Sequence, residues 1–294
     1  MKFSKLEKNG IKIFKCNALN HEFSSFKKKT AHPIDFRNGF WFKTIARFFA
    51  IKQFMKVYPG PILQIEADVW ISKDFPFREF EMISGEIAYT METSSTGSAA
   101  ILWLKDFESS LKLCAITEQL IETDPNTTDM RILGEIAKEK KMEIAILPTN
   151  PESNSSHEYG NFSNYLFDPL SYGIYFLGED PKNHQGIRKY GQTYENHLIN
   201  PNNLKVYFNE ANQIEISSLG SFKEFTLVNL HNHSKDIRLF RKKSSHKLLK
   251  RKINSFRKRK QIVFPIFIRL SMCYVYKRVK KLLIRNINLG NRIN

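Results

Sequence analysis

Two carboxylates separated by one small residue, Glu66 and Asp68, follow the apolar run "PILQI" at residues 61–65. Residues i and i+2 of an extended segment point to the same side, so both carboxylates can face one divalent cation. Acid-x-acid also occurs at residues 79–81, 106–108 and 122–124, but only Glu66 and Asp68 follow an expected core strand, where an unpaired carboxylate is costly to bury. This spacing alone fits either a cation site or two solvated carboxylates.

A second candidate cluster lies in "LVNLHNHSK" at residues 227–235. Extended geometry puts His231, His233 and Lys235 on one side of this stretch. An imidazole can complete the coordination of Mn²⁺, and a lysine can hold phosphate as a point charge. Together with the carboxylates, these groups suit a metal-bound diphosphate, whose developing negative charge the metal stabilises as a Lewis acid. The alternative is a polar strand end with solvent-facing histidines.

The hydrophobic pattern predicts strands and helices that would position these residues. Strands are expected at 10–16, 61–71, 86–92, 98–104, 142–147 and 226–235, and helices at 40–58 and 127–141. The first helix ends at Pro59-Gly60-Pro61, and the second opens with Thr-Thr-Asp, which is good capping chemistry. This order predicts an α/β fold with an open, mainly parallel, Rossmann-like sheet flanked by helices, in which ligands bind at the C-terminal ends of the strands.

The basic charge of the chain is confined to one end. Residues 236–294 contain 19 Lys and Arg and one acidic residue, a net charge of +18 within a total of +17, so the remainder is almost neutral. We therefore expect two parts, a globular domain at 1–236 and a basic helical tail at 237–294. An apolar stripe on one helical face of the tail is typical of a helix on an anionic membrane surface. A helical appendage packed on the body is the alternative.

Cysteine usage and hydropathy indicate the compartment. Cys16, Cys114 and Cys273 are odd in number and far apart, which favours a reducing environment. The N-terminus lacks the apolar region of a secretory signal, and no run reaches the roughly 18–20 apolar residues of a spanning helix. We expect a cytoplasmic protein associated peripherally with the inner face of the cell membrane.

Several stretches, taken in order, resemble bacterial glycosyltransferases of the GT-A type, which use nucleotide-diphosphate sugars in polysaccharide and lipopolysaccharide biosynthesis. They are "ARFFAIKQFMKVYPGPILQIEADVWISKDFPF", "TDMRIL", "FDPLSYGIYFLGEDPKN" and "NLHNHSK". The first is similar to the helix and strand that lead into the family's acid-x-acid metal motif, with Glu66 in place of the commoner Asp. The resemblance covers roughly residues 40–236, and the ordered set is more specific than any one motif.

The resemblance implies roles for the matching residues. Asp68 would be the principal metal ligand, and Glu66 would contact the metal, directly or through water, or the ribose. His231 or His233 would be the remaining protein ligand, and Lys235 would bind the diphosphate. The cofactor would be Mn²⁺ or Mg²⁺, the donor a nucleotide-sugar, and the acceptor a glycan or a lipid-linked molecule.

One arginine and three aspartates are further candidates. Arg47, on the helix before the motif, could reach the nucleotide, or it could be a solvated helix residue. Asp129 is a candidate catalytic base, because a carboxylate at a helix N-terminus is kept ionised by the helix dipole, although helix capping is an equally simple role. Asp168 and Asp180 are rivals for the catalytic role, with turn formation as the alternative for each.

Two other classes of protein remain open. A nucleic-acid-binding protein could use the tail as an arm on phosphates, and a metal-dependent nuclease could add the carboxylates. The neutral body and the apolar stripe of the tail disfavour nucleic acid as a partner, and a purely structural protein is the third option. The stretch before Glu66 is short for this fold, so either the first unit is abbreviated or the chain begins late, and nucleobase recognition stays open.

Overall fold

The computed structural model describes residues 28–33, 35–152, 160–184, 189–211, 213–233, 247, 249–251, 253 and 254. The chain divides into two compact units, Met1–Lys235 and Asp236–Asn294, and the fold below belongs to the first. The expected strand at 10–16, Lys235 and nearly all of the basic tail lie outside the described residues. Within the described part of the chain, no helix has both the length and the apolar character needed to cross a bilayer.

The described part of the first unit contains both helices and strands. The helices are α3 (Phe40–Val57), α4 (Phe107–Thr123), α5 (Asp129–Glu139) and α6 (Ser171–Leu177). Short 3₁₀ helices are η2 (Phe36–Asn38), η3 (Arg78–Met82), η4 (Gly160–Phe162), η5 (Pro181–His184) and η6 (Pro201–Asn203). The strands are β1 (Ile62–Ile65), β2 (Val69–Ile71), β3 (Ile87–Met91), β4 (Gly97–Leu104), β5 (Ile144–Ile146), β6 (Tyr165–Leu166), β7 (Leu204–Phe208), β8 (Ile214–Ser218), β9 (Phe225–Leu227) and β10 (Asn229–His231).

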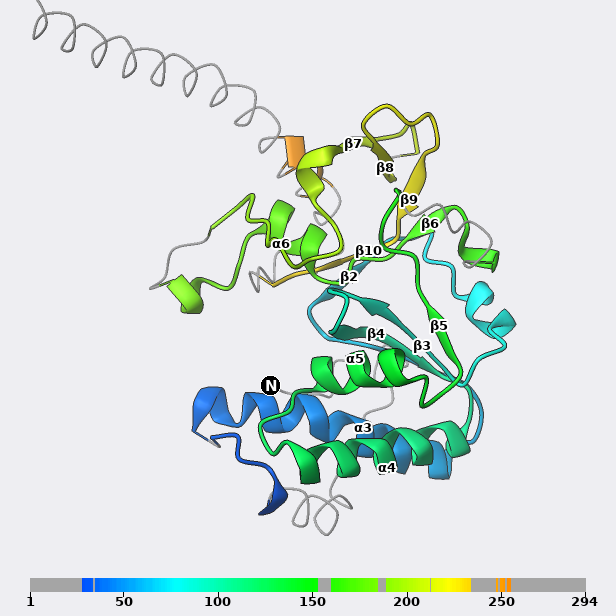
Figure 1. The fold of residues 1–294 in the computed structure, drawn as a ribbon. Helices are drawn as coiled ribbons and strands as arrows, with labels where there is room; N and C mark the ends of the chain where they lie inside the picture. The colour runs from blue at the N-terminus through cyan, green and yellow to red at the C-terminus, as the bar shows by residue number, and fades with distance from the viewer. Residues whose placement is uncertain are drawn as a thin grey trace, which may run out of the picture. The chain divides into compact units, whose positions relative to one another are not determined.

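The central sheet has the strand order β1-β4-β3-β5, and helices α3, α4 and α5 cover one of its faces (Figure 1). On that face Phe48 and Met55 of α3 pack in one core with Tyr89 and Leu102 of the sheet. The opposite face contributes Trp103 and others to a second core, which is rich in phenylalanine. Every residue of β3 and β4 is buried, because the sheet is covered on both sides.

Two further groups of strands belong to the described part of the unit. Strands β6, β9, β8 and β7 form a second sheet in the order β6-β9-β8-β7, and β10 pairs with β2 alone. The single strand expected at 226–235 is therefore two strands that separate at Val228. This residue still connects the two groups, because its N–H donates to Leu166 O and its carbonyl accepts from Ser72 N.

The mixed α/β class is confirmed, but the expectation of a mainly parallel sheet is wrong. Among the described strands only β3–β5 and β6–β9 are parallel, and the other five pairings are antiparallel. The reason is the length of the connections. Only residues 92–96 separate β3 from β4, whereas a parallel crossover needs about a dozen residues or more. The long segment 105–143, which holds α4 and α5, does return β5 parallel to β3.

Both predicted helices are confirmed, and α4 was not predicted. Helix α3 ends at Val57, just before Pro59 and Gly60. Helix α5 begins after Thr128, whose side chain accepts a hydrogen bond from Arg131 N. Helix α4 begins in the same way after Asp106, the first carboxylate of one of the other acid-x-acid pairs. That pair is therefore a helix start, since carboxylates favour this position.

Helix α5 approaches the turn between β3 and β4 so closely that position 134 must be glycine. A Cβ atom at Gly134 would lie 1.9 Å from the carbonyl oxygen of Ser95, which is backbone and cannot move aside cheaply. Gly134→Ala is therefore expected to destabilise the fold by about 1–3 kcal/mol or more, although alanine is the better helix former. Urea unfolding of Gly134→Ala and of the control Glu135→Ala, on the same helix, tests this. A stabilised Gly134→Ala protein would contradict the close packing.

Candidate functional site

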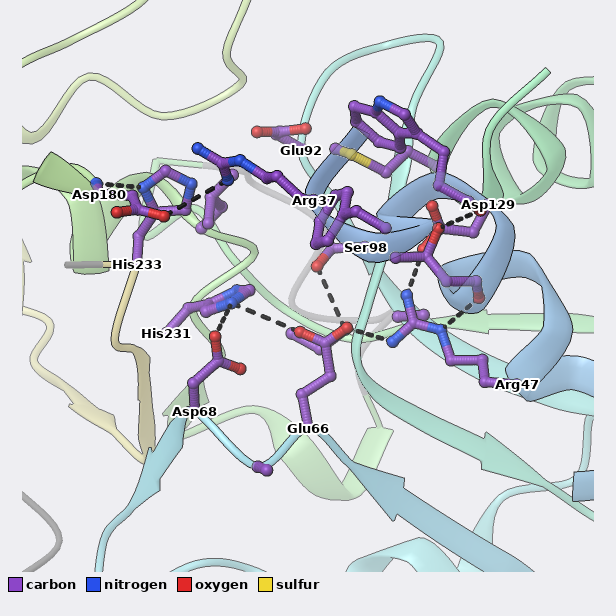
Figure 2. Close-up of a pocket in the computed structure, with 18 of the residues that line it drawn as sticks. Arg37, Arg47, Glu66, Asp68, Glu92, Ser98, Asp129, Asp180, His231 and His233 are labelled. Carbon is purple, nitrogen blue, oxygen red and sulfur yellow. Dashed lines mark hydrogen bonds and ion pairs between the residues drawn. The ribbon is translucent and has the colours of Figure 1, made fainter. Parts of the chain in front are cut away.

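A cavity of about 570 Å³ gathers residues from distant parts of the first unit (Figure 2). Seven of the residues singled out in the sequence line it: Arg47, Glu66, Asp68, Asp129, Asp180, His231 and His233. Asp168 is not part of the lining, and Lys235 lies outside the described residues. The tertiary structure thus places both predicted clusters, from residues 66–68 and 231–233, on the wall of one cavity.

The acid-x-acid segment is a turn and not an extended strand. Strand β1 ends at Ile65, and the N–H of Val69 donates to the carbonyl of Glu66 at 3.1 Å, so the reasoning from extended geometry does not apply. The two carboxylates nevertheless converge, because the turn directs both toward His231 (Figure 2). The pair does follow a strand of the central sheet, but this position does not single it out, because the pair at 106–108 follows the buried strand β4 by one residue.

Glu66, Asp68 and His231 form a compact group of potential metal ligands. The Nε2 atom of His231 lies 3.4 Å from Glu66 Oε2 and 3.5 Å from Asp68 Oδ2. One ligand atom from each residue lies within 4.8 Å of the others. Nε2 is therefore the atom that faces the carboxylates, whereas Nδ1 is buried with no hydrogen-bond partner among the described residues. Two carboxylates and one imidazole are a donor set that suits Mn²⁺ and can also hold Mg²⁺.

The β2–β10 pair positions this group. Strand β2 begins directly after Asp68, and His231 at the end of β10 pairs with Val69, so the pairing sets the carboxylate and the imidazole side by side. The N–H of Asn232 donates to the carbonyl of Asp68 at 2.7 Å and closes the same end of the pair. The chain therefore needs a long-range antiparallel pairing to assemble the three ligands.

Asp168 supports the site from beneath the surface. Its buried carboxylate accepts four backbone hydrogen bonds of 2.8–2.9 Å, from Leu170, Tyr172, Gly173 and His231. Burial raises the pKa of Asp168, although these N–H groups favour the ionised form. The carboxylate predicted as a rival catalytic base thus ties the start of α6 to the end of β10, and its acceptor sites are already used.

Arg47 links the metal-ligand group to helix α5. Its guanidinium makes ion pairs with Glu66 and with Asp129, the first residue of α5. Burial lowers the pKa of Arg47, but the two carboxylates outweigh it and raise the pKa above its ordinary value. The residue predicted to reach the nucleotide therefore bridges two other predicted residues, and Asp129 faces an arginine.

A second arginine, absent from the sequence-based predictions, lies on the cavity wall beside Asp180. Arg37 and the next two residues have left-handed backbones, with φ of 50°, 57° and 76°. The guanidinium of Arg37 lies 3.3 Å from Asp180 Oδ2. His233 accepts a hydrogen bond from the Asp180 N–H, and burial lowers the pKa of its imidazole. His233 therefore belongs with Asp180 and outside the three-residue ligand group.

Aromatic rings form another part of the cavity wall. Phe36, Phe40 and Trp41 line it, and the rings of Phe36 and Trp41 are stacked with centroids 6.4 Å apart and an interplanar angle of 6°. Phe36 is 44% exposed and Phe40 is 37% exposed, which is high for large apolar side chains. Sequence reasoning missed this wall because Phe40 and Trp41 read as apolar positions at the start of the expected helix, and Phe36 lies before it.

Glu92 also lines the cavity, and it is the lining carboxylate that sequence reasoning missed. It is buried, and burial raises its pKa to about 7. A signal was present, because Glu92 directly follows β3, just as Glu66 follows β1. A carboxylate whose pKa lies near neutrality in a cavity is able to exchange a proton at physiological pH.

Comparisons with protein-family models, with curated proteins and with solved structures found no match for this chain.

Removing the Arg47 charge tests the bridge between Glu66 and Asp129. Arg47→Met leaves both carboxylates without their cation in a largely buried setting, so a loss of about 3 kcal/mol in the free energy of unfolding is expected. Arg131→Met is the matched control, because Arg131 pairs with the exposed Asp124 and should contribute less than about 1 kcal/mol. Equal small losses in the two variants would contradict the bridge.

The raised pKa of Glu92 predicts a pH-dependent penalty on stability. The folded protein keeps the carboxyl proton of Glu92 up to about pH 7, whereas an unperturbed glutamate loses its proton near pH 4.5. The free energy of unfolding contributed by Glu92 therefore decreases as the pH rises from 4.5 to about 7. Glu92→Gln should therefore gain about 3 kcal/mol relative to wild type at pH 8 and little near pH 4.5, measured by urea unfolding with a chelator.

Glu86→Gln provides a control of opposite sign. Despite partial burial, hydrogen bonds from Lys112 and from the Glu143 N–H lower the pKa of Glu86. The Glu86→Gln protein should therefore become less stable relative to wild type as the pH rises through the acidic range.

A gain in the stability of Glu92→Gln that does not depend on pH would mean that Glu92 is not protonated in the folded protein at pH 5.

Proposed function

We propose that this chain is a metal-dependent glycosyltransferase of the GT-A type, which transfers a sugar from a nucleotide-diphosphate donor to a glycan or lipid-linked acceptor. The observation that carries the proposal is the group of Glu66, Asp68 and His231 on the wall of a cavity that also holds exposed aromatic rings. A sugar nucleotide has the matching chemistry, with a diphosphate that requires a cation and a planar base that can stack.

Each part of the cavity has a role under this proposal. Asp68, Glu66 and His231 would hold Mn²⁺ or Mg²⁺, which when bound supplies positive charge to the diphosphate leaving group. Phe36 and Trp41 offer a flat apolar surface to the nucleobase. Arg37 supplies a guanidinium for phosphate oxygens, with Lys235 as a further candidate.

The location of the enzyme is part of the same proposal. The basic, apolar-striped sequence at 237–294 would bind the anionic inner surface of the cell membrane. Lipid-linked acceptors are concentrated at such a surface. The function would then belong to polysaccharide or lipopolysaccharide biosynthesis.

Thermal stability measured with UDP-, GDP- and CMP-sugars, with and without Mn²⁺, tests the proposal on the full chain. The midpoint should rise by several degrees only when one nucleotide-sugar and Mn²⁺ are both present, because both bind only to the folded protein. Asp68→Ala should abolish this shift. The matched control is Glu81→Ala, which removes a carboxylate from another acid-x-acid pair, in η3, and should leave the shift intact.

Two results would contradict the proposal. The first is the absence of a shift with every donor, and the second is a shift with Mn²⁺ alone that Asp68→Ala does not change. Salt-sensitive binding of DNA or RNA that needs residues 240–294 would instead favour the nucleic-acid alternative.

A further inference from the structure

Five carboxylates line the described cavity, and four of them already have a partner that explains their position. The five carboxylates are Glu66, Asp68, Glu92, Asp129 and Asp180. Glu66 and Asp68 face His231, Asp129 pairs with Arg47, and Asp180 pairs with Arg37. Glu92 stands apart, because it faces another histidine, His197, whose Nε2 lies 3.3 Å from Glu92 Oε1.

His197 is held in place on both sides. The hydroxyl of Ser171 is 2.8 Å from His197 Nδ1, and the next residue, Leu198, donates its N–H to the carbonyl of Glu92 at 2.9 Å. Thr93 and His197 also form an isolated antiparallel bridge. The imidazole therefore has a fixed orientation toward the Glu92 carboxylate.

The chemistry of this chain of groups sets the histidine tautomer. An ionised Glu92 can only accept, so His197 Nε2 carries the proton and Nδ1 accepts from the Ser171 hydroxyl. Burial lowers the pKa of His197, which keeps the ring neutral in this arrangement. A neutral imidazole that donates to a carboxylate orients it without cancelling its charge.

Ser171 connects Glu92 to the metal-ligand group. It is the first residue of α6, and the start of α6 is tied to His231 by the Asp168 carboxylate. Glu92 and His231 thus share one rigid support while occupying different positions in the cavity. Such an arrangement keeps both groups in fixed positions relative to one reacting centre.

We propose that Glu92 is the general base of the transfer reaction, with His197 and Ser171 as the residues that position it. This inference rests on the proposed glycosyltransferase function and deepens it. The acceptor oxygen forms a bond to the anomeric carbon, the bond from that carbon to the diphosphate oxygen breaks with its electron pair leaving on the diphosphate, and the acceptor proton passes to the Glu92 carboxylate. A single displacement of this kind inverts the anomeric configuration.

The electrostatic surroundings of Glu92 support a base that works near neutral pH. Burial raises its pKa, the charge of His231 opposes this, and the carboxylates of Asp168 and Asp129 add to it. A base with a pKa near the working pH combines a useful ionised fraction with the strongest drive to accept a proton. Asp129, the base predicted from the sequence, is already engaged in an ion pair with Arg47.

Hydrolysis of the donor tests the base without knowledge of the acceptor, because water takes the acceptor position. The probe is the nucleotide-sugar that stabilises the wild-type protein with Mn²⁺, and the readout is release of nucleoside diphosphate. Glu92→Gln should slow release by about 100-fold or more while the Kd for donor and Mn²⁺ changes less than about twofold. Glu215→Gln is the matched control, because Glu215 is another buried glutamate with a raised pKa but does not line the cavity, so both quantities should stay unchanged.

A pH profile separates positioning from simple structural support. His197→Phe removes the Nε2–H donor that stabilises ionised Glu92, so the acid limb of the rate profile should move to higher pH. Ser171→Ala should move it in the same direction by less. A rate that falls equally at every pH would assign both residues a structural role and overturn this part of the inference.

Failure of the inference and failure of the proposed function give different results. If no donor with Mn²⁺ stabilises the wild-type protein, the glycosyltransferase proposal falls and the base assignment falls with it. If the donor binds with Mn²⁺ but wild type releases no nucleoside diphosphate, or Glu92→Gln releases it at the wild-type rate, only the assignment of Glu92 is overturned.

Discussion

Repulsion among carboxylates is the constraint on which the site depends. Five acidic side chains line the described cavity, and such charges are tolerated away from water only when each has a partner. Arg47 holds two of them, Arg37 holds a third, Asp68 faces His231 and Glu92 faces His197. Each carboxylate of the described cavity therefore faces a basic side chain.

This balance depends on backbone hydrogen bonds outside the cavity. The Asp168 carboxylate joins α6 to β10, and β10 pairs with β2 directly after the acid-x-acid turn. Neither element is long, so each relies on the other for its position. The same support reaches Glu92 through Ser171 and His197. The buried Asp168 thus supports both the metal-ligand group and Glu92.

Glu92 shows how such a site differs from a structural core. Its burial raises its pKa to about 7, which means that ionising it weakens the fold. A glutamine would fill the same space without that penalty. Groups of this kind are typical of functional positions, where stability is exchanged for reactivity.

The sequence by itself determined the local features. Helices α3 and α5 and the strand before Glu66 follow from capping residues, breakers and apolar runs, and the carboxylates and His231 stood out because their types and spacing suit a metal. Only the tertiary structure decided which of these residues meet. It separated His233 from His231, assigned Asp168 to backbone support, paired Arg47 with Asp129 and revealed Glu92 beside His197. It also made the central sheet mainly antiparallel. These outcomes depend on strand pairing and charge pairing between segments far apart in the chain. Local sequence patterns do not identify such distant partners.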